Sequence, residues 1–194
     1  MKNLLILFLW TVSSCTSVGQ RKIESFPKLS NFIDTEYSQV DNIFPIATVT
    51  MDIKGKTYKI PISYSLLHHS VDSSNFLIQG DFIDNYSFKI LDNGKFKPMF
   101  KKETLFLPTD WTPYLTKTRQ KVDSMKSKIN LNNYLQFLPE PEWWQNDATP
   151  LSEDGSTMKF ICQLELGDIT TDDCILFIFF DPKRKLVKQI YQRD

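Results

Sequence analysis

Residues 46–62 read IATVTMDIKGKTYKIPI, and this stretch decides the fold because apolar and polar side chains alternate on both sides of Lys54 and Gly55. Alternation with a period of two is typical of a half-buried β-strand, and a Lys-Gly pair suits the two-residue loop of a tight hairpin. We therefore predict an antiparallel hairpin in which Ile53 lies opposite Lys56. The same register pairs Met51 with Tyr58, Val49 with Ile60 and Thr48 with Pro61.

A second hairpin is predicted at residues 86–100, which read YSFKILDNGKFKPMF. Asn93 and Gly94 are the pair preferred in a type I′ turn, because both of its loop residues need a positive φ. A two-residue loop at this pair places Leu91 opposite Phe96 and Phe88 opposite Met99.

The prolines inside these hairpins, Pro61 and Pro98, indicate edge strands, because proline has no N–H to donate to a further neighbour. A strand is also predicted at residues 75–83 (NFLIQGDFI), with a bend or bulge at Gly80. Apolar residues at helical spacing predict a short helix near residues 33–40.

Residues 111–128 form the one long helix that the sequence predicts. Asp110 or Thr109 can cap its start, and Pro113 is tolerated in the first turn. Side chains that recur every three or four positions give it an apolar stripe, whereas charged residues fill the remaining surface. The stripe consists of Trp111, Tyr114, Leu115, Thr118, Val122 and Met125.

The C-terminal third predicts three further strands, at residues 158–166, 174–181 and 185–192. No polar residue occurs from position 175 to 180, as expected of a central strand that is buried on both faces. Together the elements predict a single β-rich α+β domain over residues 31–194. Its sheet system is largely antiparallel and built from hairpins, and the main helix covers one face.

The first 14 residues are organised like a signal peptide, with a positive charge at Lys2 and the apolar run LLILFLWTV at residues 4–12. As a helix this run rises only about 14 Å, less than half of a hydrocarbon core of about 30 Å. The sequence Val-Ser-Ser-Cys that ends at Cys15 resembles the bacterial lipobox, whose cysteine sulfur receives a diacylglycerol. We predict cleavage after residue 14 and lipidation of Cys15, with residues 15–30 as a tether to a membrane of the bacterial cell envelope. The alternative is an ordinary signal peptide with a chance cysteine.

Composition and charge disfavour a nucleic-acid-binding protein, a nucleotide-binding enzyme and a disordered chain. The chain carries 23 Lys plus Arg and 23 Asp plus Glu, so no basic excess favours nucleic acid as a partner. Neither GxGxxG nor GxxxxGK[ST] occurs, so the sequence predicts no phosphate-cradling loop and no cofactor. Aromatic residues make up 13% of the chain, which favours a packed core over disorder.

Two cysteines, Cys162 and Cys174, remain once Cys15 is lipidated. Outside the cytoplasm they could form a disulfide. Both lie in apolar runs, however, where free cysteine behaves as a small hydrophobe, so two buried thiols are the alternative that we favour.

The last sixty residues carry a family resemblance. Pro141 through Gln145 (PEWWQ) form a Pro-x-Trp-x-Gln-like segment, and a Gln-Leu-acidic strand and a Phe-rich strand that ends at Asp181 follow it. This pattern resembles the C-terminal half of the YwqG-like family of bacterial proteins of unknown function. The resemblance covers about a third of the chain, and it implies a β-rich α+β fold without supplying a reaction.

Titratable residues show no catalytic or metal-binding signature. His68 and His69 are the only histidines, and neighbours on a strand point to opposite faces, so they make a poor metal pair. No GxSxG elbow is present for a His-dependent triad. Carboxylates are plentiful near turn-like segments, where Asp normally forms turns, although a glycosidase pair could be among them. These carboxylates are Asp81, Asp84, Asp147, Glu153, Asp154, Asp172 and Asp173.

Trp143, Trp144 and Gln145 are the best candidate binding residues in the sequence. Two consecutive tryptophans in an extended segment cannot both face the core, so one ring could stack on a ligand or a protein partner. The alternative, which we favour, is that both rings are structural and lie buried beneath a loop.

The sequence thus favours a non-enzymatic binding or interaction domain, anchored by lipid on Cys15 and without metal or cofactor. A second hypothesis is an envelope immunity protein that neutralises a toxin. A third is a hydrolase that uses carboxylates of the kind described above.

Overall fold

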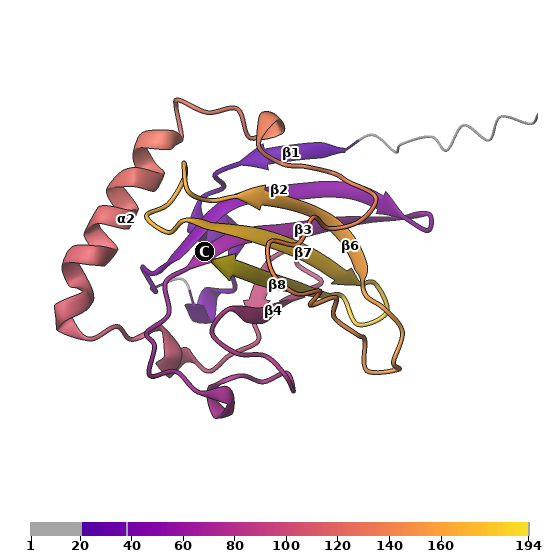
Figure 1. Cartoon of the computed structure of the whole chain (residues 1–194), viewed down its shortest axis with the longest axis horizontal. Helices are drawn as coiled ribbons and strands as arrows, with labels where there is room; N and C mark the ends of the chain where they lie inside the picture. Colours follow the sequence, from indigo (N-terminus) through magenta and orange to yellow (C-terminus); the bar gives the residue numbers. More distant parts are fainter. Residues whose placement is uncertain (1–20, 38, 194) are drawn as a thin grey trace, which may run out of the picture.

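The computed structural model describes residues 21–37 and 39–193, so the predicted leader and Cys15 lie outside the described residues. The protein folds into two antiparallel sheets, one of three strands in the order β1-β2-β3 and one of five in the order β5-β4-β8-β7-β6. Figure 1 shows the sheets stacked on each other, with helix α2 at one end of the strands. The predicted α+β class with mostly antiparallel strands is therefore confirmed. Within the described part of the chain, every helix is too short or too polar to cross a membrane.

The three-stranded sheet comprises β1 (Lys22–Ser25), β2 (Ile43–Ile53) and β3 (Lys56–Ser65). The five-stranded sheet comprises β4 (Asn85–Ile90), β5 (Phe96–Pro98), β6 (Lys159–Glu165), β7 (Cys174–Asp181) and β8 (Leu186–Arg193). The α-helices are α1 (Leu29–Phe32) and α2 (Thr112–Met125). Strand β1 pairs with β2, and Ile23 and Leu29 pack against the core, so the predicted boundary between a tether at residues 15–30 and a domain at residues 31–194 is wrong. Short 3-10 turns occur at Thr35–Tyr37, Ser73–Asn75, Lys102–Leu105, Thr109–Trp111 and Leu131–Asn133.

The hairpin predicted at residues 46–62 is confirmed as β2 and β3, with Ile53 opposite Lys56 and Thr48 opposite Pro61. Lys54 and Gly55 both have positive φ, of 51° and 76°, as the two central residues of a type I′ turn require. In its sheet, β3 has β2 as its one strand neighbour, so the edge position that Pro61 predicts is also confirmed.

The second hairpin forms, but its predicted register is wrong by one residue. β4 and β5 pair Phe88 with Pro98 and Ile90 with Phe96, whereas the prediction placed Phe96 opposite Leu91. Of the two residues predicted to need positive φ, Gly94 alone has it, so the loop spans three residues and not two. Because a one-residue slip turns every side chain to the other face, burial of these apolar pairs selects the observed register. The edge position of β5, predicted from Pro98, is confirmed.

Residues 75–83 do not form the predicted strand. The segment makes isolated bridges from Phe76 to Phe100 and from Phe82 to Asn85, and it turns at Gly80, where φ is +81°. The single short helix predicted near residues 33–40 is replaced by two helical turns, one at Leu29–Phe32 and one within the predicted range at Thr35–Tyr37.

Strand β7 is buried along its whole length, as the absence of polar residues predicted. Its side chains divide between two cores, because neighbours on a strand point to opposite faces. Leu176, Ile178 and Phe180 belong to the core between the sheets, whereas Phe177 and Phe179 pack in a second, outer cluster. The outer cluster is closed by the segment between α2 and β6, which Figure 1 shows in orange in front of the C-terminal strands.

A side chain of β8 satisfies the backbone of β3 where the two sheets meet. Gln189 accepts a hydrogen bond of 2.9 Å from the Ser63 N–H and donates one of 3.1 Å to the Ser63 carbonyl oxygen, which also accepts 2.7 Å from the Tyr191 hydroxyl. All three residues are buried, where unpaired backbone groups would be costly. The pairing locks one sheet against the other at a single place along both strands.

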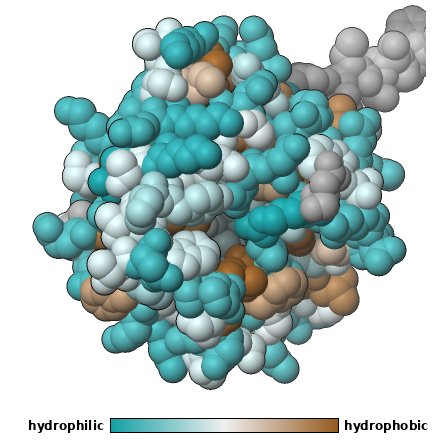
Figure 2. Space-filling view, turned by 60° about the vertical axis from the view of Figure 1, so that its left-hand side comes forward, coloured by the Kyte–Doolittle hydropathy of each residue, from teal (hydrophilic) through white to brown (hydrophobic). Residues whose placement is uncertain are grey.

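Helix α2 confirms the amphipathic helix predicted at residues 111–128, although it ends at Met125. Thr118 and Val122 are its buried residues. In Figure 1 the helix lies across one end of the strands, so the prediction that it covers a sheet face is wrong. Figure 2, viewed from this side, shows a mainly hydrophilic surface with a small hydrophobic area below its centre.

Candidate functional site

The tryptophan pair predicted as a binding segment separates into one structural and one exposed ring. Trp143 packs on the outer face of β7, with its ring centroid 4.3 Å from that of Phe177 and 5.8 Å from that of Phe179. Trp144 points away and is 38% exposed. The favoured alternative, in which both rings are buried, is therefore wrong for Trp144.

The backbone of the same segment is tied to β8. The N–H groups of Trp144 and Gln145 donate hydrogen bonds of 2.9 and 3.0 Å to the side-chain oxygen of Gln192, which is buried. The Gln145 side-chain amide donates 2.5 Å to the Arg193 carbonyl oxygen. Gln145 thus holds the segment beside the C-terminal end of β8.

Cys162 and Cys174, considered above as a possible disulfide, are both free and buried in the structure. In the ladder, Cys162 lies opposite Ile178 and Cys174 lies opposite Arg193, so the thiols occupy different positions along the sheet. Burial raises the pKa of Cys174 to about 12 and raises that of Cys162 further. Both are small core side chains and not reactive thiolates.

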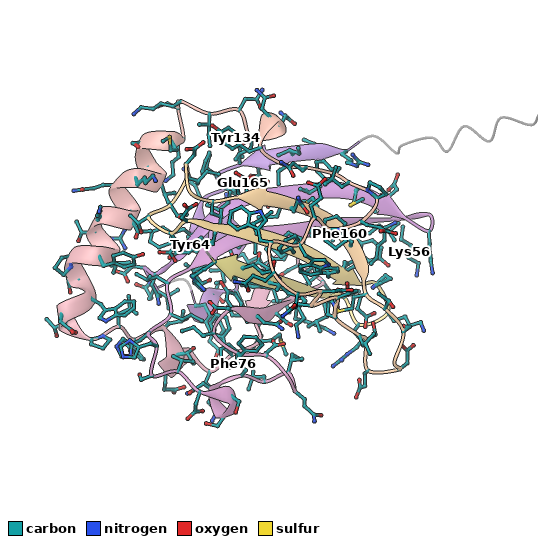
Figure 3. All side chains as sticks on the ribbon, viewed as in Figure 1. Lys56, Tyr64, Phe76, Tyr134, Phe160 and Glu165 are labelled. Carbon is teal, nitrogen blue, oxygen red and sulfur yellow. The ribbon has the colours of Figure 1, made fainter. Side chains whose placement is uncertain are left out.

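A cleft that combines apolar walls with a few charged and hydroxyl groups lies where β3 and β8 end beside the first turn of α2. It encloses about 370 Å³ and includes Tyr64 of β3, Tyr114 of α2, Asp172 of the β6–β7 loop and Arg193 of β8, together with Asp84 just before β4. We call it the Asp172 cleft. Figure 3 shows Tyr64 near α2 and Lys56 at the opposite end of the same strand.

Asp172 is the acceptor at the centre of this cleft. Its Oδ2 accepts a hydrogen bond of 2.6 Å from the Tyr64 hydroxyl and lies 3.4 Å from the Arg193 Nη2, and its Oδ1 accepts from the Tyr114 hydroxyl. Burial, followed by the Asp172 charge and hydrogen bond, raises the pKa of Tyr64 far above its ordinary value. The pKa of Tyr114 is raised by burial and by its hydrogen bond to Asp172. Both phenols therefore remain neutral donors that hold the carboxylate in one orientation.

Arg193 joins the two carboxylates of the cleft. Its Nη1 donates to Asp84 and its Nη2 reaches Asp172. Burial opposes the charge of the guanidinium, but the hydrogen bond and charge of Asp84 and the charge of Asp172 outweigh burial and raise the Arg193 pKa. Two carboxylates and one guanidinium give the cleft a formal charge of about −1 at neutral pH.

Helix α2 holds the loop that carries Asp172 at two points. The hydroxyls of Thr118 on α2 and Thr171 on the loop lie 2.6 Å apart, and the Lys121 ammonium donates to the Gly167 carbonyl oxygen. A Cβ at Gly167 would lie 2.9 Å from a carboxylate oxygen of Asp173, so this position suits glycine. The cleft is thus preorganised, because its central acceptor sits on a braced loop.

An aromatic wall borders the polar groups. The rings of His68 and His69 lie 4.0 Å apart, and the Trp111 ring lies 4.9 Å from His68 and 5.9 Å from both His69 and Tyr114. The argument that neighbouring histidines point to opposite faces does not apply, because both residues lie beyond the end of β3 and outside any strand. His69, Trp111 and Tyr114 line the Asp172 cleft.

A second cleft of about 340 Å³ lies next to the first and shares Asp84 and Arg193 with it. Gln145 and Phe82 line this second cleft, and Phe82 is 49% exposed. The predicted binding segment therefore borders the site through Gln145, whereas Trp144 lines neither cleft.

The geometry gives no support to a hydrolase with a carboxylate pair. Asp84 and Asp172 both contact the Arg193 guanidinium, so neither carboxyl group has the apolar surroundings that set a general acid apart from its partner. Burial raises the pKa of Asp81, but this carboxylate pairs at 2.9 Å with Lys188 in the interior. In residues 21–37 and 39–193, no three His, Cys, Asp or Glu side chains gather as a metal site would require.

Sequence reasoning named Asp84 and Asp172 among the carboxylates near turns, but it did not bring them together with tyrosines and an arginine, because five separate segments contribute to the Asp172 cleft. Comparison with family models, with curated proteins and with solved structures gives no match. The resemblance to the YwqG-like family therefore stays a prediction.

Proposed function

We propose that the chain is a lipid-anchored, non-enzymatic binding domain of the bacterial cell envelope and that its ligand site is the Asp172 cleft. One observation carries the proposal: a braced carboxylate, fixed by two neutral phenols and a guanidinium, lies beside an accessible aromatic wall. A few fixed polar groups in an aromatic-lined cleft are typical of small-ligand sites. These groups satisfy one another without a nucleophile and base in contact, which supports binding over catalysis.

The anchor is tested through Cys15, whose sulfur is the atom that lipid would join. We expect the native chain to incorporate labelled palmitate in its producing bacterium and to sediment with membranes. Cys15→Ala should abolish labelling and release the protein from the membrane fraction. Undiminished labelling of the variant would contradict the lipid anchor.

The binding role is tested with the cell-wall polysaccharide, lipid and protein fractions of the producing bacterium's envelope. Immobilised full chain should retain material from one fraction, and Trp111→Ala should reduce the retained amount about tenfold, equivalent to about 1.4 kcal/mol. Trp144→Ala is the matched control, because it removes an indole that lines neither cleft. Equal retention by both variants, or no retention at all, would refute the Asp172 cleft as the ligand site.

A protein partner is the second candidate, and it includes the toxin that an immunity protein would neutralise. Leu77 and Leu151 are 50% and 64% exposed, and they border one further cleft together with Arg184. Exposed apolar side chains rimmed by charge are typical of protein interfaces. If the protein fraction is retained through this surface, Leu77→Ser and Leu151→Ser should abolish retention, whereas Trp111→Ala should have no effect.

A further inference from the structure

The Asp172 cleft and the second cleft adjoin at Asp84 and Arg193, which line both, and together they make one candidate site with an aromatic ring in each cleft. Trp111 lines the Asp172 cleft, and Phe82 lines the second cleft. On the basis of the proposed function, we infer that this site binds a neutral oligosaccharide that lies across the Asp84–Arg193 pair, with one sugar unit against Trp111 and another against Phe82.

The charges of the site oppose an acidic ligand most strongly. An anion would meet Asp84 and Asp172, and Asp147 in the second cleft, whereas a cation that spans both clefts would meet the Arg193 guanidinium between them. A zwitterion needs a free guanidinium for its carboxylate, but both Nη atoms of Arg193 are already directed at the two aspartates. The site therefore suits a molecule that carries hydrogen-bond donors and acceptors and no acidic group.

Sugar hydroxyls meet this requirement, because each hydroxyl both donates and accepts. Asp84 accepts hydrogen bonds and its side chain is about one-third exposed, so hydroxyls can reach it. The Tyr64 and Tyr114 hydroxyls hold Asp172 as an acceptor at the floor of the cleft. The C–H face of a pyranose ring is apolar and stacks on aromatic rings, which Trp111 and Phe82 provide.

The length of the site points to more than one sugar unit. The clefts enclose about 370 and 340 Å³, and the ion pair lies between them. A single ring that stacks on Trp111 would leave Phe82 without a contact, although this phenylalanine is 49% exposed beside the second cleft. An oligosaccharide occupies both.

The experiment uses the full chain in a sugar-free detergent and measures binding of maltotriose, cellotriose and chitotriose by calorimetry, backed by an array of neutral glycans. At least one glycan should bind saturably, and raising NaCl from about 0.05 M to about 0.5 M should leave the affinity unchanged. Trp111→Ala and Phe82→Ala should each weaken binding about tenfold. Trp144→Ala and Phe106→Ala are matched controls that should not, because each removes an exposed ring outside both clefts.

Asp84→Asn is a second site variant that keeps the shape of the side chain and does not depend on removal of a packed ring. It should weaken the glycan about tenfold as well. If no glycan binds but a tetralysine peptide does, with loss in Trp111→Ala and at high salt, the saccharide inference is refuted and the proposed binding site stands. If neither probe binds, the saccharide inference is refuted, and the envelope-fraction experiment decides the proposed function. Equal losses of affinity in the site variants and the control variants would refute both the saccharide inference and the proposed binding site.

Discussion

Trp143 and Trp144 are adjacent in sequence, but only Trp143 covers the outer face of the five-stranded sheet. Comparing alanine variants of the two tests how much that cover contributes to stability. Trp143 covers Phe177 and Phe179, whereas Trp144 is 38% exposed and packs in neither core. Replacing each by alanine in turn removes the same side chain from positions one residue apart. Only the first replacement opens a cavity over β7.

The expected magnitude follows from the buried surface. A buried indole removes about 150–250 Å² from water, and at about 25 cal/mol per Å² complete burial contributes roughly 4–6 kcal/mol. Trp143 is partly exposed at the edge of the cluster, so Trp143→Ala should lower the free energy of unfolding by about 3 kcal/mol. Trp144→Ala should cost less than about 1 kcal/mol, as is usual for exposed positions.

Urea unfolding, monitored by circular dichroism, measures the free energy of unfolding of the Trp143→Ala and Trp144→Ala variants. The midpoint should fall clearly for Trp143→Ala at an unchanged denaturant slope, because the variant changes stability and not the surface exposed on unfolding. Iodide should quench a Trp143→Phe variant, which keeps Trp144, more than a Trp144→Phe variant. Equal stability losses in the two alanine variants, or less than about 1 kcal/mol for Trp143→Ala, would refute the division of roles.

Three further predictions concern the core. Phe177→Ala and Phe179→Ala should each cost about 3–5 kcal/mol in urea unfolding, and values under about 1 kcal/mol would contradict a central, doubly covered β7. Asp81→Leu should destabilise the protein by about 3–5 kcal/mol because it leaves the Lys188 ammonium without its partner, and adding Lys188→Met to this variant should recover most of that loss. In a Cys15→Ser variant, Ellman's reagent should label neither remaining thiol of the folded protein but both after unfolding without reductant, and fewer than two labelled thiols would indicate a disulfide.

The β2–β3 hairpin could be predicted from sequence to the residue. Strict alternation permits one register that buries Val49, and Lys54 and Gly55 allow a two-residue turn. Asn93 and Gly94 gave a weaker prediction, since the same pair fits a two-residue or a three-residue loop. The burial of Phe88 and Ile90 in the folded protein selects the three-residue loop and the observed register with β5. This selection depends on tertiary packing and not on the local sequence.

The pairing of distant strands was beyond local patterns. β8 lies between β7 and β4, although nearly a hundred residues separate β4 from β8 in sequence. The same distance explains why the Asp172 cleft was missed. Tyr114 was assigned to a core stripe and Asp172 to a turn, and both assignments describe their local segments correctly. Their meeting depends on how α2 and the β6–β7 loop pack, which no short-range pattern records.

The tryptophan segment shows the opposite case, in which a local rule was informative. Alternation along an extended chain implied that one indole faces the core and the other does not, and this is what Trp143 and Trp144 do. The rule could not say whether the exposed ring borders a cleft. In the structure Gln145 lines the second cleft, whereas Trp144 does not.

The most direct test of the Asp172 cleft is to follow the indole N–H signals of Trp111, Trp143 and Trp144 by heteronuclear NMR while the envelope polysaccharide fraction is added. Single Trp→Phe variants assign the signals. The proposal predicts that the Trp111 signal shifts with added polysaccharide while those of Trp143 and Trp144 stay in place. A shift confined to Trp144, or none at Trp111, would contradict the claim that this protein binds its ligand at the Asp172 cleft.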